Sequence, residues 1–122
     1  FKKITCNVND KTKKNCVIMG KNTWDSLPKK PLVNRINIII SKNNYDIINN
    51  EYNNREDIKI FNNLNNVFEY VNNLDIIESA FIIGGAILYN ECLENHIDKI
   101  KFVYNITINY DNDPIYCCLL FK

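Results

Sequence analysis

Three cations and two glycine turns are the features of this sequence that could do chemistry. Lys21, Arg35 and Lys42 each lie beside a short apolar run, and two such runs end at Gly20 and at Gly84–Gly85. A glycine turn that leads into a helix presents bare backbone N–H groups, which suit an anion when a cation lies nearby. The pattern therefore predicts a site for a ligand with several negative charges, and a nucleotide cofactor fits it.

Each of these residues taken alone favours a structural interpretation, because a single glycine turn or a solitary cation is most often unrelated to a ligand. The combination points to a site. Thr23 and Ser41 add hydroxyl groups beside two of the cations, and Arg35 has the fork geometry that clamps a carboxylate. The single histidine, His96, has no partner at metal-ligand spacing, so we predict no metal site.

Short apolar runs predict the elements that must position these residues. Five runs rich in β-branched residues read as strands, at Cys16–Met19, Ile36–Ser41, Ile58–Phe61, Ala80–Gly84 and Ile100–Tyr104. Because they are apolar nearly throughout, they are typical of a parallel sheet covered by helices on both faces. Helices are predicted between them at Asn22–Leu27, Asn63–Val71 and Gly85–Leu93, the last with apolar residues Ile87, Leu88 and Leu93. The alternation indicates an α/β doubly wound domain.

Two other segments have weaker patterns. Tyr45–Glu56 is rich in asparagine and has no apolar period, which predicts an exposed loop. Phe1–Thr5 has the pattern of the tail of a further helix. Ligands of doubly wound sheets bind beyond the carboxyl ends of the strands, so we expect the residues that follow the strands to converge.

Composition narrows the classes of function. With 122 residues the chain should form one domain, and a formal charge of +1 gives no field that would collect nucleic acid. No apolar run approaches the ~20 residues of a membrane helix. Five cysteines without C-x-x-C spacing indicate reduced thiols and a cytoplasmic protein. The chain starts at Phe1 without an initiator Met or a signal sequence, which we interpret as a fragment of a longer protein.

Two segments resemble signatures of one family. The run from Val17 to Lys42 is similar to the signature of dihydrofolate reductases, and the run from Phe81 to Tyr89 is similar to their second signature. The resemblance implies reduction of 7,8-dihydrofolate to tetrahydrofolate by NADPH, a step of one-carbon metabolism and a target of folate-like inhibitors. The richness in Asn and Ile resembles the reductase part of protozoan bifunctional chains, which implies a fused thymidylate synthase domain.

The resemblance also implies roles for individual residues. The cofactor would be bound by Gly20, Lys21, Asn22, Thr23, Ser41, Lys42, Gly84, Gly85, Ala86, Ile87 and Tyr89. The substrate would contact Phe1, Ser26, Leu27, Leu32, Arg35 and Ile83, with Arg35 on the glutamate carboxylate of folate. The family further implies a cis peptide between Gly84 and Gly85.

The sequence departs from the family at both ends, so 1–122 reads as a single, partial domain. The acidic residue that assists protonation lies upstream of Phe1 in the family, so no catalytic residue is assigned within the chain. The family's first strand, between the strands at Ala80–Gly84 and Ile100–Tyr104, and its C-terminal hairpin have no match. We therefore expect a gap with unpaired backbone groups between those two strands. Val103 replaces a Thr of the family's proton network.

Two alternative functions remain open at this point. One is a riboflavin-pathway pyrimidine reductase of the same fold, which uses NADPH but has no folate tail to bind. The other is a non-catalytic remnant or gene fragment of the family that at most binds a nucleotide. Arg35 and the run from Thr23 to Ser26 favour folate over the pyrimidine substrate.

Overall fold

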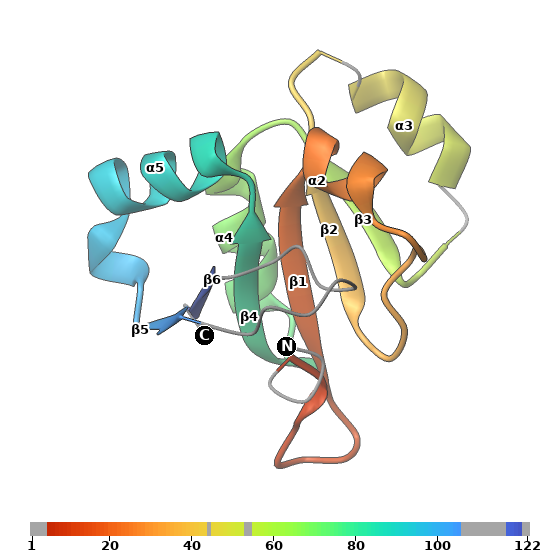
Figure 1. Cartoon of the computed structure of the whole chain (residues 1–122). Helices are drawn as coiled ribbons and strands as arrows, with labels where there is room; N and C mark the ends of the chain where they lie inside the picture. The colour runs from red at the N-terminus through yellow and green to blue at the C-terminus, as the bar shows by residue number, and fades with distance from the viewer. Residues whose placement is uncertain (1–4, 44, 53–54, 106–116, 121–122) are drawn as a thin grey trace.

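The computed structural model describes residues 5–43, 45–52, 55–105 and 117–120, and Figure 1 shows their arrangement. The strands are β1 (Lys14–Gly20), β2 (Ile36–Ile40), β3 (Ile58–Phe61), β4 (Ile77–Gly84), β5 (Phe102–Asn105) and β6 (Cys117–Leu120). The helices are α2 (Lys21–Ser26), α3 (Tyr45–Tyr52), α4 (Leu64–Asn73), α5 (Ala86–Asn95) and the short 3-10 helix η1 (Ile97–Lys99). All five expected strands are confirmed, with ends that differ by up to three residues.

One sheet holds all the described strands, in the order β3-β2-β1-β4-β6-β5. Strands β1 to β4 are parallel, and β6 is antiparallel to both β4 and β5. In β1, Cys16 and Ile18 pack on the face covered by α4 and α5, whereas Val17 and Met19 pack on the face of α2 and α3. The mostly parallel α/β sheet with helices on both faces is confirmed.

Helices α4 and α5 show which residues turn toward the sheet. Asn63 caps α4 as predicted, because its Oδ1 accepts a hydrogen bond of 2.9 Å from Asn66 N. In α5, Leu88 and Cys92 are buried and lie one turn apart. Ile87, which we expected on the same apolar face, is 87% exposed, because it is displaced by about 100° around the helix from Leu88. Among the described residues no helix is long and apolar enough to cross a membrane.

The prediction of a loop at Tyr45–Glu56 is wrong, because Tyr45–Tyr52 form α3. Asparagine is a poor helix former, and its density hid a short apolar stripe. Ile48 on that stripe is 3% exposed, and Tyr45 and Tyr52 pack against the same core cluster. The ring of Tyr52 meets that of Trp24 edge to face, with centroids 5.8 Å apart. Tertiary packing, which local sequence does not report, stabilises this helix.

The expected gap beside β4 is filled. β6 lies between β4 and β5, with Phe81 and Ile82 opposite Leu120 and Leu119 on one side. On its other side it pairs with all four residues of β5. The expectations of unpaired backbone groups there, and of no antiparallel strand near the C-terminal end, are therefore corrected for the described residues. Cys117–Leu120, where no strand was predicted, supplies the missing ladder partners.

Candidate functional site

Three glycines and a threonine meet where β1 and β4 end. The two strands are neighbours, and α2 and α5 start from their carboxyl ends at the same edge of the sheet (Figure 1). A Cβ atom on Gly84 would lie 3.1 Å from Thr23 Oγ1, and one on Gly85 would lie 3.4 Å from it. A Cβ atom on Gly20 would lie 4.0 Å from Gly85 N. The predicted convergence of these residues is confirmed.

Backbone conformation makes glycine necessary at one of these positions. Gly84 has φ +145°, a region that side chains rarely adopt. The peptide between Gly84 and Gly85 is cis, as the family resemblance implied. Gly85 caps α5 without a side-chain hydrogen bond, and the first turn of that helix holds no acidic residue. Small residues and backbone therefore form this edge.

The side chains of α2 interact mainly with their own helix. Lys21 Nζ lies 2.5 Å from both carboxylate oxygens of Asp25, one helical turn on, and both side chains are partly exposed. Ser26 Oγ donates a hydrogen bond of 2.8 Å to Thr23 O. Asn22 is exposed. A phosphate that bound Lys21 would thus compete with Asp25 for the ammonium group.

The remaining predicted cofactor residues surround this edge at different depths. Ser41 and Lys42 follow β2, whose last residue is paired with Gly20. Ser41 is buried with its N–H on Phe61 O at 2.9 Å, whereas Lys42 is exposed. Ala86 and Ile87 are exposed at the start of α5, and Tyr89 packs against the core on the α4 and α5 face.

Three predicted substrate residues share one apolar cluster. Leu27 and Ile83 are buried on the α2 and α3 face, and Leu32 packs against them from the loop before β2. Ser26 is exposed at the end of α2, and Phe1 lies outside the described residues. The cluster therefore brings residues of three different segments into one apolar wall.

Arg35 is 3% exposed and makes short hydrogen bonds inside the protein. Its Nε donates to Val33 O at 3.0 Å and its Nη1 donates to Thr5 Oγ1 at 2.9 Å. The guanidinium is thus a buried cation with a fixed orientation, not the surface arginine that its sequence alone favours. From Arg35 to Ser41 the chain runs the length of β2, about 20 Å. Ligands that together contact both Arg35 and Ser41 must therefore span about this distance.

Two buried asparagines near Arg35 were missed at the sequence level. Asn37 is fully buried on β2, and Asn15 is 1% exposed on β1. Both donate and accept hydrogen bonds with backbone groups: Asn37 with the loop before β2, and Asn15 with the segment before β1 and with β4. A signal for Asn37 was present, because a single amide in the otherwise apolar strand Ile36–Ile40 requires buried partners.

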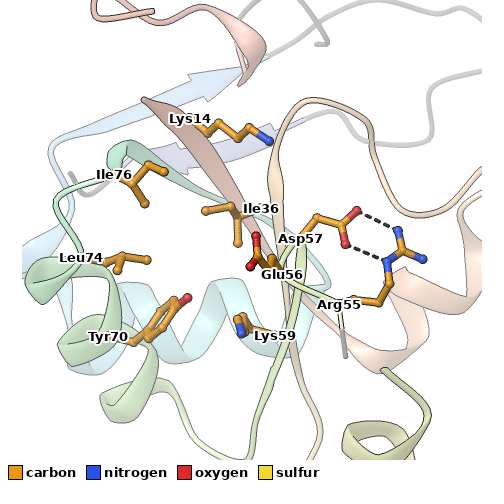
Figure 2. Close-up of a pocket in the computed structure, with 9 residues that line it drawn as sticks. All are labelled: Lys14, Ile36, Arg55, Glu56, Asp57, Lys59, Tyr70, Leu74 and Ile76. Carbon is orange, nitrogen blue, oxygen red and sulfur yellow. Dashed lines mark hydrogen bonds and ion pairs between the residues drawn. The ribbon is translucent and has the colours of Figure 1, made fainter. Parts of the chain in front are cut away.

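A hollow of about 590 Å³ lies at the opposite edge of the sheet and contains none of the predicted site residues. It is lined by Lys14, Ile36, Arg55, Glu56, Asp57, Lys59, Tyr70, Leu74 and Ile76. Figure 2 shows Tyr70 of α4 and Leu74, which follows that helix, on one side and Glu56 and Asp57 on the other. The hollow is not the predicted cofactor site, which we expect at the carboxyl ends of the strands, because it lies at their amino ends.

The charges around the hollow are largely paired or mixed. Arg55 binds Asp57 through two hydrogen bonds of 3.0 and 2.8 Å, drawn in Figure 2, and this pairing lowers the pKa of Asp57. Burial raises the pKa of the Tyr70 hydroxyl, which therefore stays protonated. With cations and carboxylates on the same walls, the hollow selects no single class of ligand.

Comparisons with known proteins agree with the signatures in the sequence. The family model described as dihydrofolate reductase matches residues 4–116. The chain is 33% identical over 118 residues to the dihydrofolate reductase of Heliothis virescens, covering 95% of this chain and 62% of that protein. It is 40% identical over 98 residues to a bifunctional dihydrofolate reductase-thymidylate synthase of Plasmodium chabaudi, covering 78% of this chain and 16% of that protein. The chain thus spans less than two thirds of each relative.

A solved structure supports the fold. The Schistosoma mansoni dihydrofolate reductase aligns with a TM-score of 0.65 at 24% identity, and the alignment covers 98% of this chain and 80% of that chain. At this level of identity the similarity shows that the two chains share a fold.

Proposed function

Because the chain belongs to the dihydrofolate reductase family, we propose that its protein reduces 7,8-dihydrofolate to 5,6,7,8-tetrahydrofolate with NADPH, within one-carbon metabolism. One observation carries the proposal. Gly20, Thr23 and the Gly84–Gly85 pair converge at one edge of the sheet, and Arg35 lies a strand's length away. Such an arrangement suits a nucleotide at the glycine edge and a carboxylate-bearing substrate that reaches Arg35.

The edge formed by Gly20, Gly84 and Gly85 suits the cofactor because its backbone is not covered by side chains of its own. A Cβ on Gly84 would lie 3.1 Å from Thr23 Oγ1, so the absence of a side chain lets Thr23 pack closely on this backbone. The free first turn of α5 offers N–H donors for a phosphate, and Lys42 adds a cation. NADPH, when bound, supplies the hydride that reduces C6 of the substrate. The chain's own residues hold and orient the reactants.

On the substrate side, the apolar wall and the buried guanidinium have separate tasks. Leu27, Leu32 and Ile83 exclude water from one side of the ring system. Arg35 offers a fork of donors for the carboxylate at the far end of the substrate. Proton delivery to N5 is assigned to an acidic residue upstream of Phe1, as the family resemblance implies. Within α2 the Asp25 carboxylate is paired with Lys21.

The proposal is tested by following NADPH oxidation, through its near-ultraviolet absorbance, in the presence of dihydrofolate. Two proteins are compared: residues 1–122 alone, and a form extended upstream of Phe1 by the coding sequence. We expect the extended form to turn over dihydrofolate, and the short form to be slower by roughly 100- to 10,000-fold, the usual worth of acid-base assistance. Equal rates would show that a carboxylate within the chain, such as Asp25, donates the proton.

Other outcomes identify the alternatives. NADPH binding without oxidation by the extended form would indicate a non-catalytic remnant. Oxidation with the riboflavin-pathway pyrimidine substrate, but not with dihydrofolate, would indicate the other reductase. We expect folate-like inhibitors to compete with dihydrofolate, which the same assay measures.

Two coarser proposals concern the protein's context. The bifunctional relative from Plasmodium chabaudi supports a fused thymidylate synthase domain, and reading the coding sequence downstream of Lys122 tests for it. Cys6, Cys16 and Cys92 are not joined in disulfides, which supports a reducing, cytoplasmic location that fractionation of the source cells tests.

A further inference from the structure

Asn37 fastens the loop that carries Arg35. Its Oδ1 accepts a hydrogen bond of 2.9 Å from Leu32 N, and its Nδ2 donates to Leu32 O at 2.9 Å and to Arg35 O at 3.1 Å. Packing holds the loop at Leu32, which lies against the core cluster, but not at Val33, which is 57% exposed. The fully buried Asn37 side chain on β2 therefore holds this loop in place through its hydrogen bonds.

Asn15 fastens the second segment that meets Arg35. Its Nδ2 donates to Thr5 O and to Asn7 O, both at 2.9 Å. Its Oδ1 accepts from Ser79 N at 3.0 Å, which ties the segment to β4. The backbone that carries the Thr5 hydroxyl is therefore anchored to the centre of the sheet.

The two fastened segments supply the acceptors that orient the guanidinium. Val33 O, in the loop held by Asn37, accepts from Arg35 Nε. Thr5 Oγ1, in the segment held by Asn15, accepts from Arg35 Nη1. Arg35 Nε and Nη1 are thus held by acceptors in two separate segments. These two hydrogen bonds determine the plane of the guanidinium group.

We propose that Asn37 and Asn15 are positioning residues that set the orientation in which Arg35 binds the substrate carboxylate. The inference rests on the proposed function, because it takes the carboxylate of folate as the partner of Arg35. Bidentate binding depends on the direction of the guanidinium plane as well as on its charge. Neither asparagine needs to touch the substrate, since both act through backbone groups.

The test measures orientation and binding separately in the extended protein. Hydrogen exchange of the Arg35 Nε–H, followed by NMR, reports the anchoring. Affinities for three ligands report how well Arg35 binds the substrate carboxylate: folate, pteroate, which lacks the glutamate, and NADPH. We expect Asn37→Leu to speed the exchange and weaken folate binding, each about tenfold, as when hydrogen bonds that hold a group are lost. Pteroate and NADPH affinities should stay within about twofold.

Matched variants separate positioning from stability. Ile38→Ala removes a fully buried side chain from the same strand, on the face opposite to the cluster against which Leu32 packs. It should lower the melting temperature and leave both the Arg35 exchange and the preference for folate unchanged. Thr5→Val removes the hydroxyl that accepts from Arg35 Nη1 but keeps the shape of the side chain, so it should reproduce the Asn37→Leu effect. Thr5→Ser keeps the hydroxyl and should behave as wild type. If Asn37→Leu does not fold, this Thr5 pair and Asn15→Ser decide the question.

The outcomes distinguish the inference from the function beneath it. A wild-type protein that binds folate and pteroate equally would show that Arg35 is not the carboxylate clamp, so the proposed assignment itself fails. A wild type that prefers folate, with variants that keep this preference or the slow exchange, would overturn the positioning role alone. Faster exchange together with a lost preference for folate supports it.

Discussion

The two edges of the sheet are built from opposite materials. At the carboxyl edge, Gly20, Gly84 and Gly85 leave the backbone bare, and the nearest side-chain atom is the hydroxyl of Thr23. At the amino edge, side-chain amides and a guanidinium bind backbone groups of the loops and of β4. The carboxyl edge depends on the absence of side chains, and the amino edge depends on hydrogen bonds made by side chains. Substitutions that add a side chain should therefore damage the carboxyl edge, and substitutions that remove hydrogen-bonding groups should damage the amino edge.

The largest effect is expected at the amino edge. Arg35→Leu should weaken folate binding by roughly 2–5 kcal/mol, because it removes one partner of a desolvated charge pair. NADPH binding should be unchanged, since the cofactor would bind a strand's length away. Equilibrium titrations with both ligands measure the difference. Equal losses for both would show that Arg35 supports the whole fold and not a substrate clamp.

At the carboxyl edge, a single added methyl group should be costly at one glycine and harmless at another. Gly84→Ala places a side chain at φ +145° and 3.1 Å from Thr23 Oγ1, which should cost roughly 1–3 kcal/mol of stability and abolish NADPH binding. Gly20→Ala, with 4.0 Å of clearance, should cost about 0.5 kcal/mol or less. Urea unfolding of the two variants measures both values. Similar costs would contradict the idea that this edge is shaped by missing side chains.

The charge of Lys21 at the carboxyl edge should affect the affinity for NADPH much more than the stability of the fold. Lys21→Gln breaks an exposed one-turn ion pair with Asp25, typically worth about 0.3–0.5 kcal/mol. The same change should reduce NADPH affinity and make its dependence on salt weaker, because a phosphate contact is lost. Titrations at two ionic strengths test this. An unchanged salt dependence would remove Lys21 from the cofactor site.

The smallest effect is expected from an exposed carboxylate at the amino edge. Glu78 accepts hydrogen bonds from Asn9 N and Asp10 N at 2.8 and 2.9 Å, and these lower its pKa below the ordinary 4.5. Its contribution to stability is therefore complete above pH 4.5 and is lost as the pH falls through the lowered pKa. Glu78→Gln should be slightly less stable than wild type at neutral pH and equal to it in strong acid. A difference that persists in acid would show that the carboxylate charge is not responsible.

The sequence was informative where a pattern is local or where topology alone brings residues together. Uniform apolar runs predict β1 to β5 as strands, and the rule for carboxyl ends predicts Gly20 beside Gly84–Gly85. The Asn63 cap was also predictable, because its hydrogen bond spans only three residues. These features require no knowledge of distant contacts.

The rest depends on partners far away in the sequence. Helix α3 is stabilised by packing on Trp24 and its neighbours, so its own asparagine-rich sequence gave no sign of it. β6 is a strand because its backbone pairs with β4 on one side and with β5 on the other. The roles of Asn15 and Asn37 depend on which loops fold back onto them. The burial of Arg35 follows from the same contacts, which is why its sequence alone favoured a surface position.

The place of β6 in the sheet has a consequence for the order of folding during synthesis. Among the described strands β5 pairs with β6, and it joins the sheet through that strand. Cys117 is made twelve residues after Asn105, so β5 is synthesised before the strand that joins it to the sheet. At about 5–20 residues per second this interval is on the order of one second. Until β6 pairs with it, this edge of β4 has unpaired backbone groups that another extended chain could bind.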